Sequence, residues 1–296
     1  MFASGTRGWV ILGARRQTLS TFDFRLLTLN FSFPGDPLSV RVCVLASGSR
    51  GNATWIATER TCLLVDAGLS RKETYARLAA VGERPATCNA IVISHEHQDH
   101  LAGLRVLALD LKIPICIAPE TRDAVEWDSR LKAFESITAG EKFTVGDIEV
   151  APFSIPHDAV DPLAFTFVSQ GIKIGVVTDL GYLPEVVKQH VRGCHALILE
   201  SNHDLEMLKI GPYPWHVKQR VLSRHGHLSN LATAEFLSEN FDGTAQVLVL
   251  AHLSENNNHP EIARLTAQEA LSRRPGGEQT ALHLANFATP TQVFHF

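Results

Sequence analysis

From residue 40 onward, short apolar runs alternate with stretches in which apolar residues recur at helical spacing. Apolar runs of this length are typical of buried strands. They predict strands at 41–46, 54–58, 62–68, 89–95, 113–118, 147–155, 163–169, 172–178, 196–201, 246–252 and 280–287. The helical spacing predicts helices at 70–81, 101–111, 120–127, 184–191, 215–224, 230–241 and 260–274.

The order of these elements predicts an α/β protein in which two mixed sheets pack together with helices outside. The turn-rich SGSRGN (47–52) joins the first two strands, so we expect these two strands to be antiparallel. Residues 1–39 show no such pattern, and we expect them to form a poorly structured extension. Residues 40–296 then form one domain.

Composition narrows the class of protein. The chain is 45% hydrophobic and 20% charged, which is ordinary for a globular protein. Its net charge is −4, so any contact with nucleic acid must come from a local patch. Five cysteines without a C-x-x-C pair indicate free thiols in a reducing compartment. We find neither a convincing signal peptide nor a transmembrane helix and expect a cytoplasmic protein.

The stretch SHEHQDHLAG (94–103) places four metal-binding side chains directly after a predicted buried strand. Imidazole and carboxylate groups are the ligands that borderline and hard divalent metals take. The candidates are His95, His97, Asp99 and His100. Because four ligands on one loop cannot all face a single ion, the pattern indicates two ions that are completed by residues elsewhere.

Three further candidates, His157, Asp179 and His252, stand at the ends of other predicted strands. Loops at strand ends often carry functional side chains on a rigid frame. Each of these residues alone is more often a capping or turn residue. Together with the H-x-H-x-D-H stretch, they point to a metal centre.

This order of motifs resembles the metallo-β-lactamase superfamily, from about residue 41 to about residue 287. The resemblance implies a four-layer αββα sandwich with the site at one edge, between the sheets. It assigns His95, His97 and His157 to the first metal, Asp99, His100 and His252 to the second, and Asp179 to both as a bridge. Asp66 of DAG (66–68) falls in the family's supporting position, where a buried group orients metal ligands.

The implied chemistry is hydrolysis by two divalent ions, Zn²⁺ or Mn²⁺ with iron also suited to the ligands. Ions about 3.5–4 Å apart would share a hydroxide nucleophile and neutralise charge on the scissile group. Asp99 would also accept a proton. The superfamily acts on β-lactams, thioesters, lactones and phosphodiesters, so the fold does not choose the substrate.

Residues 207–234 bear on the substrate because they contain four Lys or Arg residues and no acid, a local charge of +4. Tyr213 and Trp215 lie in the same stretch as Lys218 and Arg220. Basic groups interleaved with aromatics suit phosphate backbones and stacked bases. A solvated basic helix face is the alternative interpretation.

Within GHLSN (226–230), His227 is a candidate leaving-group acid, and His203 is a second one. Ser229 or Asn230 would cap the following helix, whose free N–H groups can hold an anion. A structural hydrogen-bonding role is the alternative for both histidines.

Two more loops are candidates for substrate contact. The turn around Gly48 and Gly51 would direct N–H groups at an oxyanion, with Ser47, Ser49 and Asn52 as candidate contacts, although a plain hairpin turn is equally compatible. Asn256 and Asn257 follow His252 and would hold their loop or contact substrate.

The stretches SGSRGN, SNHD, PYPWHVKQRV, GHLSN and AHLSENNNHP are similar to the bacterial YycJ/WalJ-like subgroup. That similarity implies a phosphodiesterase acting as a 5′-to-3′ exonuclease on single-stranded DNA or duplex ends, with DNA repair proteins as partners. Two alternatives stay open. One is a small-molecule thioester or lactone hydrolase of the glyoxalase II type, and the other is RNase Z-like RNA processing.

Overall fold

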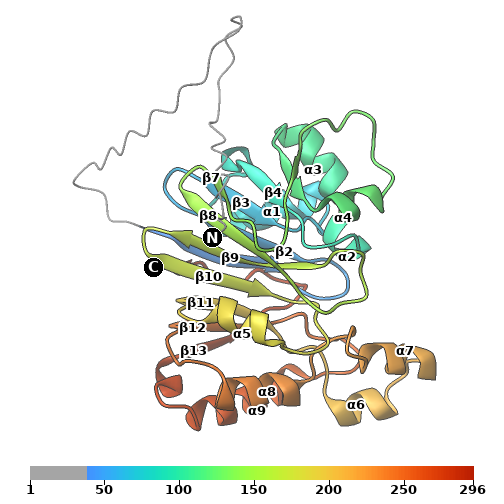
Figure 1. Ribbon diagram of the computed structural model, residues 1–296, viewed down its shortest axis with the longest axis vertical. Helices are drawn as coiled ribbons and strands as arrows, with labels where there is room; N and C mark the ends of the chain where they lie inside the picture. Colours follow the sequence, from blue (N-terminus) through green and yellow to red (C-terminus); the bar gives the residue numbers. More distant parts are fainter. Residues whose placement is uncertain (1–38) are drawn as a thin grey trace, which may run out of the picture.

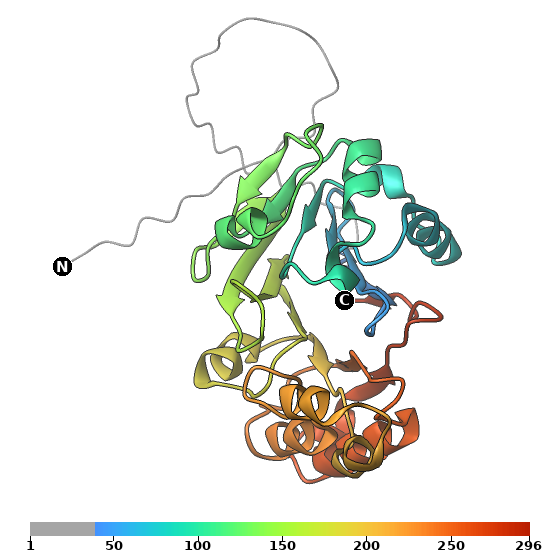
Figure 2. The ribbon, with the colours of Figure 1, turned by 90° about the vertical axis from the view of Figure 1, so that its right-hand side faces the viewer.

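The computed structural model describes residues 39–296, so the expected extension lies outside the described residues except for its last position. In this part of the chain, two seven-stranded sheets pack face to face, and helices cover both outer faces (Figure 1, Figure 2). The predicted α/β sandwich of two mixed sheets flanked by helices is confirmed.

The first sheet has the spatial order β14 (Phe294–His295), β1 (Arg41–Ala46), β2 (Ala53–Ala57), β3 (Cys62–Val65), β4 (Ala90–Val92), β5 (Ile115–Ile117) and β6 (Phe134–Ser136). The second has the order β13 (Ala281–Leu284), β12 (Val247–Ala251), β11 (Ala196–Glu200), β10 (Ile172–Val177), β9 (Leu163–Ser169), β8 (Ile148–Ser154) and β7 (Phe143–Val145). β1 and β2 pair antiparallel, as predicted.

The helices lie outside these sheets. They are α1 (Arg71–Ala80), α2 (Gln98–Leu101), α3 (Leu104–Leu111), α4 (Pro119–Asp123), α5 (Glu185–Val191), α6 (Leu205–Ile210), α7 (Trp215–Val221), α8 (Asn230–Glu239) and α9 (Pro260–Ser272). None of the described helices is long and apolar enough to span a bilayer.

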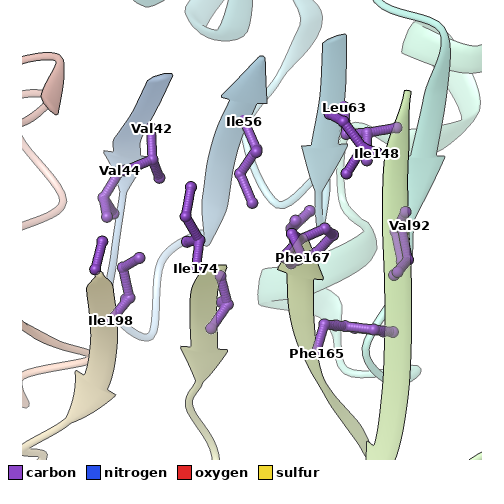
Figure 3. Packing of buried hydrophobic residues seen from close by; sticks show 14 of the residues in the cluster. Val42, Val44, Ile56, Leu63, Val92, Ile148, Phe165, Phe167, Ile174 and Ile198 are labelled. Carbon is purple, nitrogen blue, oxygen red and sulfur yellow. The ribbon is translucent and has the colours of Figure 1, made fainter. Parts of the chain in front are cut away.

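Successive side chains of a strand point to opposite faces of its sheet, so the apolar side chains are divided between two layers. In β1, Val42 and Val44 face the second sheet, whereas Cys43 and Leu45 pack on the opposite side, with the residues of α3. Figure 3 shows the inner layer, in which side chains from the two sheets meet, with Phe167 contributed by β9. Strands with apolar residues on both faces therefore become the middle two layers of four.

The prediction of one helix over 101–111 is wrong at its start. The structure has two helices, α2 and α3, with Gly103 between them. A side chain at Gly103 would place its Cβ 1.7 Å from the carbonyl oxygen of Leu69. This close approach fixes the bend and turns α2 toward the ends of the strands. The helix predicted over 120–127 ends at Asp123, and β6, β7, β14 and α6 were not predicted.

Truncation of the inner layer tests the packing. Phe167 is 2% exposed, so we expect Phe167→Ala to lower the free energy of unfolding by about 3–5 kcal/mol through lost burial and a cavity. Urea denaturation measures this value. Val160→Ala is the control, because Val160 is 58% exposed and its truncation should change stability by less than about 0.5 kcal/mol. Equal effects of the two substitutions would contradict this account of the core.

Candidate metal centre

The candidate ligands all follow strands at one edge of the sandwich. His95 and His97 follow β4, and α2 carries Asp99 and His100. His157, Asp179 and His252 follow β8, β10 and β12. β10, β11 and β12 are parallel, as are β3 and β4, so their carboxyl ends open at common edges. This topology brings together residues up to about 150 positions apart in sequence.

His95, His97 and His157 form the first group, with one ligand atom from each within 4.8 Å of the others. His157 Nε2 lies 3.3 Å from His97 Nδ1. His95 is fully buried, and Ser94 Oγ lies 2.9 Å from its Nδ1. Burial, aided by the neighbouring His100, lowers the pKa of His95, which keeps its ring neutral and a lone pair free for a metal.

Asp99, His100 and His252 form the second group within the same distance limit. Asp99 Oδ2 lies 3.5 Å from His100 Nε2 and 3.6 Å from His252 Nε2. Burial raises the pKa of Asp99, but the neighbouring imidazoles of His100 and His252 outweigh it and hold the pKa below its usual value. The carboxylate is therefore ionised, as a metal ligand must be.

Asp179 lies between the two groups. Its Oδ2 is 3.4 Å from His100 Nε2, and it also groups with His95 and His100 within 4.8 Å. Its Oδ1 is 3.1 Å from His252 Nδ1. Asp179 therefore lies beside His95 of the first group and beside His100 and His252 of the second, as a bridging ligand would.

The chemistry of the site fits divalent ions. Among the described residues, His95 Nε2, Asp179 Oδ2 and His252 Nε2 are buried without a hydrogen-bond partner. Each such atom costs about 1–3 kcal/mol if left unsatisfied. Imidazole and carboxylate atoms gathered in this way suit Zn²⁺ or Mn²⁺, which would satisfy them together.

Three residues at this edge adopt left-handed backbone conformations. Asp66, Asp179 and His252 have φ of 62°, 63° and 54°. This conformation costs a non-glycine residue about 1–3 kcal/mol and persists where the surrounding structure enforces it. It turns the chain sharply just after β3, β10 and β12, at residues whose own side chains lie at the candidate site.

Asp66 holds His100 from behind. Its Oδ2 accepts a hydrogen bond of 2.8 Å from His100 Nδ1, and its Oδ1 accepts one of 2.9 Å from the backbone N–H of Ser94. With Nδ1 engaged, Nε2 of His100 is the atom left for a metal. Asp66 thus lies behind His100, a candidate metal ligand, and its supporting role stays a prediction.

Glu200, at the end of β11, is a site residue that the sequence analysis missed. It is fully buried, and its Oε1 lies 2.9 Å from His227 Nδ1 and 2.8 Å from His252 Nδ1. Its Oε2 accepts hydrogen bonds from the backbone N–H groups of Leu180 and Leu228. The signal in the sequence that could have identified Glu200 is its position directly after the apolar run ALIL. Asp179 likewise follows a predicted strand.

Glu200 also groups with Asp179, His227 and His252 at metal-binding distance. Because four N–H groups already occupy both of its oxygens, we assign it to positioning rather than to metal ligation. Burial raises the pKa of Glu200, but His227 and His252 outweigh this effect and hold the pKa below its usual range. A buried carboxylate therefore fixes the orientation of both imidazoles.

The two candidate acids differ in their surroundings. The ring centroid of His227 lies 5.1 Å from those of both His157 and His252, beside the metal ligands. His203 is 1% exposed, and neither ring nitrogen has a partner among the described residues. Burial lowers the pKa of His203 to about 4, so its ring is neutral at neutral pH. The geometry favours His227 as the proton donor.

Several candidate substrate contacts are engaged within the protein. Ser229 Oγ accepts from Ala232 N at the start of α8, and the Asn230 side chain bonds Ser201 and Asn258. Ser47 Oγ accepts from His252 N. The Asn257 side chain donates to Ser254 Oγ.

Other candidates lie nearer to the ligands or to solvent. Asn52 Nδ2 donates to Asp99 Oδ2 over 3.1 Å, so Asn52 contacts a metal ligand directly. Ser49, Asn256 and Trp215 are exposed, whereas Tyr213 is half-buried. Lys218 Nζ donates to the Lys209 carbonyl, and Arg220 is paired with Asp158.

Comparison with known proteins gives a consistent result. Residues 61–285 match the family described as the beta-lactamase superfamily domain. The chain is 35% identical to exodeoxyribonuclease YycJ of Bacillus anthracis over 266 residues, covering 86% of this chain and 99% of that protein. It is also 35% identical to exodeoxyribonuclease WalJ of Streptococcus pneumoniae, covering 80% and 90% respectively.

The fold has a counterpart among solved structures. The metallo-β-lactamase fold protein YhfI from Bacillus subtilis superposes with a TM-score of 0.67 at 17% identity, covering 87% of this chain and all of that one. At this identity the likeness concerns the fold alone.

Metal addition tests the ligand set. We expect Mn²⁺ or Zn²⁺ to raise the melting temperature of metal-stripped protein, because an ion that binds only the folded state stabilises it by about 2.7 kcal/mol at 100 times its Kd. Asp179→Asn should abolish most of this rise in melting temperature. His225→Ala, which removes an exposed histidine, should retain the rise. Differential scanning calorimetry measures the shift. An undiminished shift in Asp179→Asn would contradict the bridging role.

Proposed function

The chain belongs to the metallo-β-lactamase superfamily and, within it, to the YycJ/WalJ group, and we propose that it is a metal-dependent exodeoxyribonuclease. The observation that carries the proposal is 35% identity along 99% of a relative named exodeoxyribonuclease. The ligand groups and the His227–Glu200 pair supply a geometry suited to phosphodiester hydrolysis. We extend the proposal to 5′-to-3′ polarity, which the resemblance of the motifs implies.

The seven ligands would hold two divalent ions, with Asp179 between them. Such ions supply a water activated for attack at neutral pH and positive charge that offsets the charge of the phosphodiester. Asp99 is held ionised beside Asn52, which donates to its Oδ2. This carboxylate is placed to ligate and to accept the proton that the attacking water loses.

His227 would donate a proton to the departing sugar oxygen. Its Nδ1–H donates to Glu200 Oε1, which leaves Nε2 to face substrate. The buried Glu200 carboxylate holds the imidazole in this orientation through that contact. After transfer the ring is neutral, and the leaving group departs as an alcohol.

The proposal also includes the location of the activity and its partners. We place the activity in the cytoplasm, in keeping with the five cysteines, which are buried free thiols in the described part of the chain. DNA repair proteins are the partners that the resemblance implies. A thioester or lactone hydrolase and an RNA processor remain the outcomes that the assay below distinguishes.

Labelled nucleic acids test the proposed activity directly. With Mn²⁺ or Zn²⁺, we expect stepwise shortening of DNA from its 5′ end, followed on 5′- and 3′-labelled strands by gel electrophoresis. RNA of the same sequence, a thioester and a lactone are assayed beside it. Asp99→Ala should be inactive because it removes a ligand and the proton acceptor. Rapid thioester or lactone turnover without cleavage of any nucleic acid would refute the nuclease function.

Substitution of His227 tests the proton donor. We expect His227→Ala to lower kcat on DNA about 10²–10⁴-fold, the usual contribution of a general acid. Thymidine 5′-p-nitrophenyl phosphate should be cleaved by this variant at nearly the normal rate, because p-nitrophenolate departs without protonation. Exposed His225→Ala is the matched control. Equal losses on both substrates would assign His227 to metal binding or to structure instead.

A further inference from the structure

The helices α6 and α7 stand out from the body of the protein on the side where α2 lies (Figure 1). They are inserted between Glu200 and His227, so the chain leaves the metal centre, forms this projection and returns to the centre. Among the described residues, no side chain of α7 is fully buried. Because α7 has no fully buried side chain, it contributes little to the hydrophobic core. Its exposed surface is therefore a candidate binding surface.

The side chains of α7 divide into two faces. Val217, Lys218 and Val221 are half-buried against the protein. The outer face consists of the exposed residues Trp215, His216, Gln219 and Arg220. The spacing of these four residues places them on one side of a helix with 3.6 residues per turn.

One end of this outer face is fixed at the metal centre. Arg220 forms an ion pair with Asp158, whose Oδ1 lies 3.4 Å from Nε2 of the ligand His157. The backbone N–H of His227 donates to the carbonyl of Val221 over 3.0 Å. The outer face of α7 therefore begins beside both a metal ligand and the proposed acid.

Trp215 stands at the other end, five residues and about 7.5 Å along the helix axis from Arg220. It is 68% exposed, whereas Trp55 is fully buried and Trp127 donates its indole N–H to the Arg122 carbonyl. Residues 207–234 contain no acid, so the indole lies in a locally positive stretch. An exposed indole in such surroundings matches the stacking platforms of proteins that bind single-stranded nucleic acid.

We infer that the outer face of α7 guides an unpaired DNA end to the metal centre, with one base stacked on Trp215. The inference rests on the proposed nuclease function and adds the form of the substrate. Paired bases inside a duplex have both faces covered by their neighbours, so stacking requires an unpaired nucleotide. The 7.5 Å span corresponds to about two nucleotides at 3.4 Å each. A blunt duplex must therefore fray by about two base pairs before it is cut.

Three substrates test the role of Trp215 separately from the nuclease function. They are a single-stranded oligonucleotide, the same sequence as a blunt duplex, and thymidine 5′-p-nitrophenyl phosphate, which is too short to reach Trp215. Wild-type protein should show a lower KM for the single strand than for the blunt duplex. A two-nucleotide overhang on the duplex should restore most of that difference.

Substitution of Trp215 should change only the longer substrates. We expect Trp215→Ala to raise KM for the single strand about 5- to 150-fold, the usual loss on removing a stacked aromatic. Trp215→Phe should remain close to wild type, and hydrolysis of the p-nitrophenyl ester should be unchanged in both variants. Leu265→Ala is the matched control, because Leu265 is a large apolar side chain, 56% exposed, on α9.

Fluorescence tests the contact without cleavage. In an Asp99→Ala background, single-stranded DNA should quench tryptophan emission, and Trp215→Phe should abolish most of that quenching. An active wild-type enzyme whose KM is unaffected by Trp215→Ala would overturn the inference and leave the nuclease function intact. A wild type that cleaves neither DNA nor the ester would overturn the nuclease function, whereas the quenching experiment would still decide the role of Trp215.

Discussion

Buried carboxylates hold the histidines of the metal centre, and the rest of the site depends on this interaction. Asp66 binds Nδ1 of His100, and Glu200 binds Nδ1 of both His227 and His252. Each contact leaves one ring nitrogen directed away from its carboxylate. Carboxylates can be kept ionised in such a buried place only when N–H donors surround them, and the strand ends and turns of this edge supply those donors.

The shared carboxylate of Glu200 links binding and proton transfer. A single oxygen contacts both the ligand His252 and the proposed acid His227, so their positions are set together. The backbone of residues 221–227 adds a second link, because it joins the end of α7 to the same histidine. The proposed acid His227 and the surface proposed to guide DNA are therefore parts of one continuous segment between β11 and α8.

The fold class and most of the strands could be predicted from sequence because most of the strands are apolar on both faces. The ligands His95, His97, Asp99 and His100 stood out because they are crowded within six positions. The strands β6 and β7, whose sequences are FES and FTV, were missed because neither lies in a longer apolar run. Glu200 was missed because one acid after an apolar run has many ordinary explanations.

Local pattern thus determined which residues can bind metal and which segments are buried, since both depend on side-chain chemistry and spacing along the chain. The packing of segments that are far apart in the sequence determined the remaining contacts of the site. The expected cap of α8 is Ser229, as the sequence predicted, whereas folding directs the side chain of Asn230 to Ser201 and Asn258. Arg220 is one of four basic residues in 207–234, and its pairing with Asp158 exists only because the loop after β8 meets α7 beside the candidate metal centre. Contacts between residues far apart in the chain leave no periodic signal, so they emerge only when the sheets have packed.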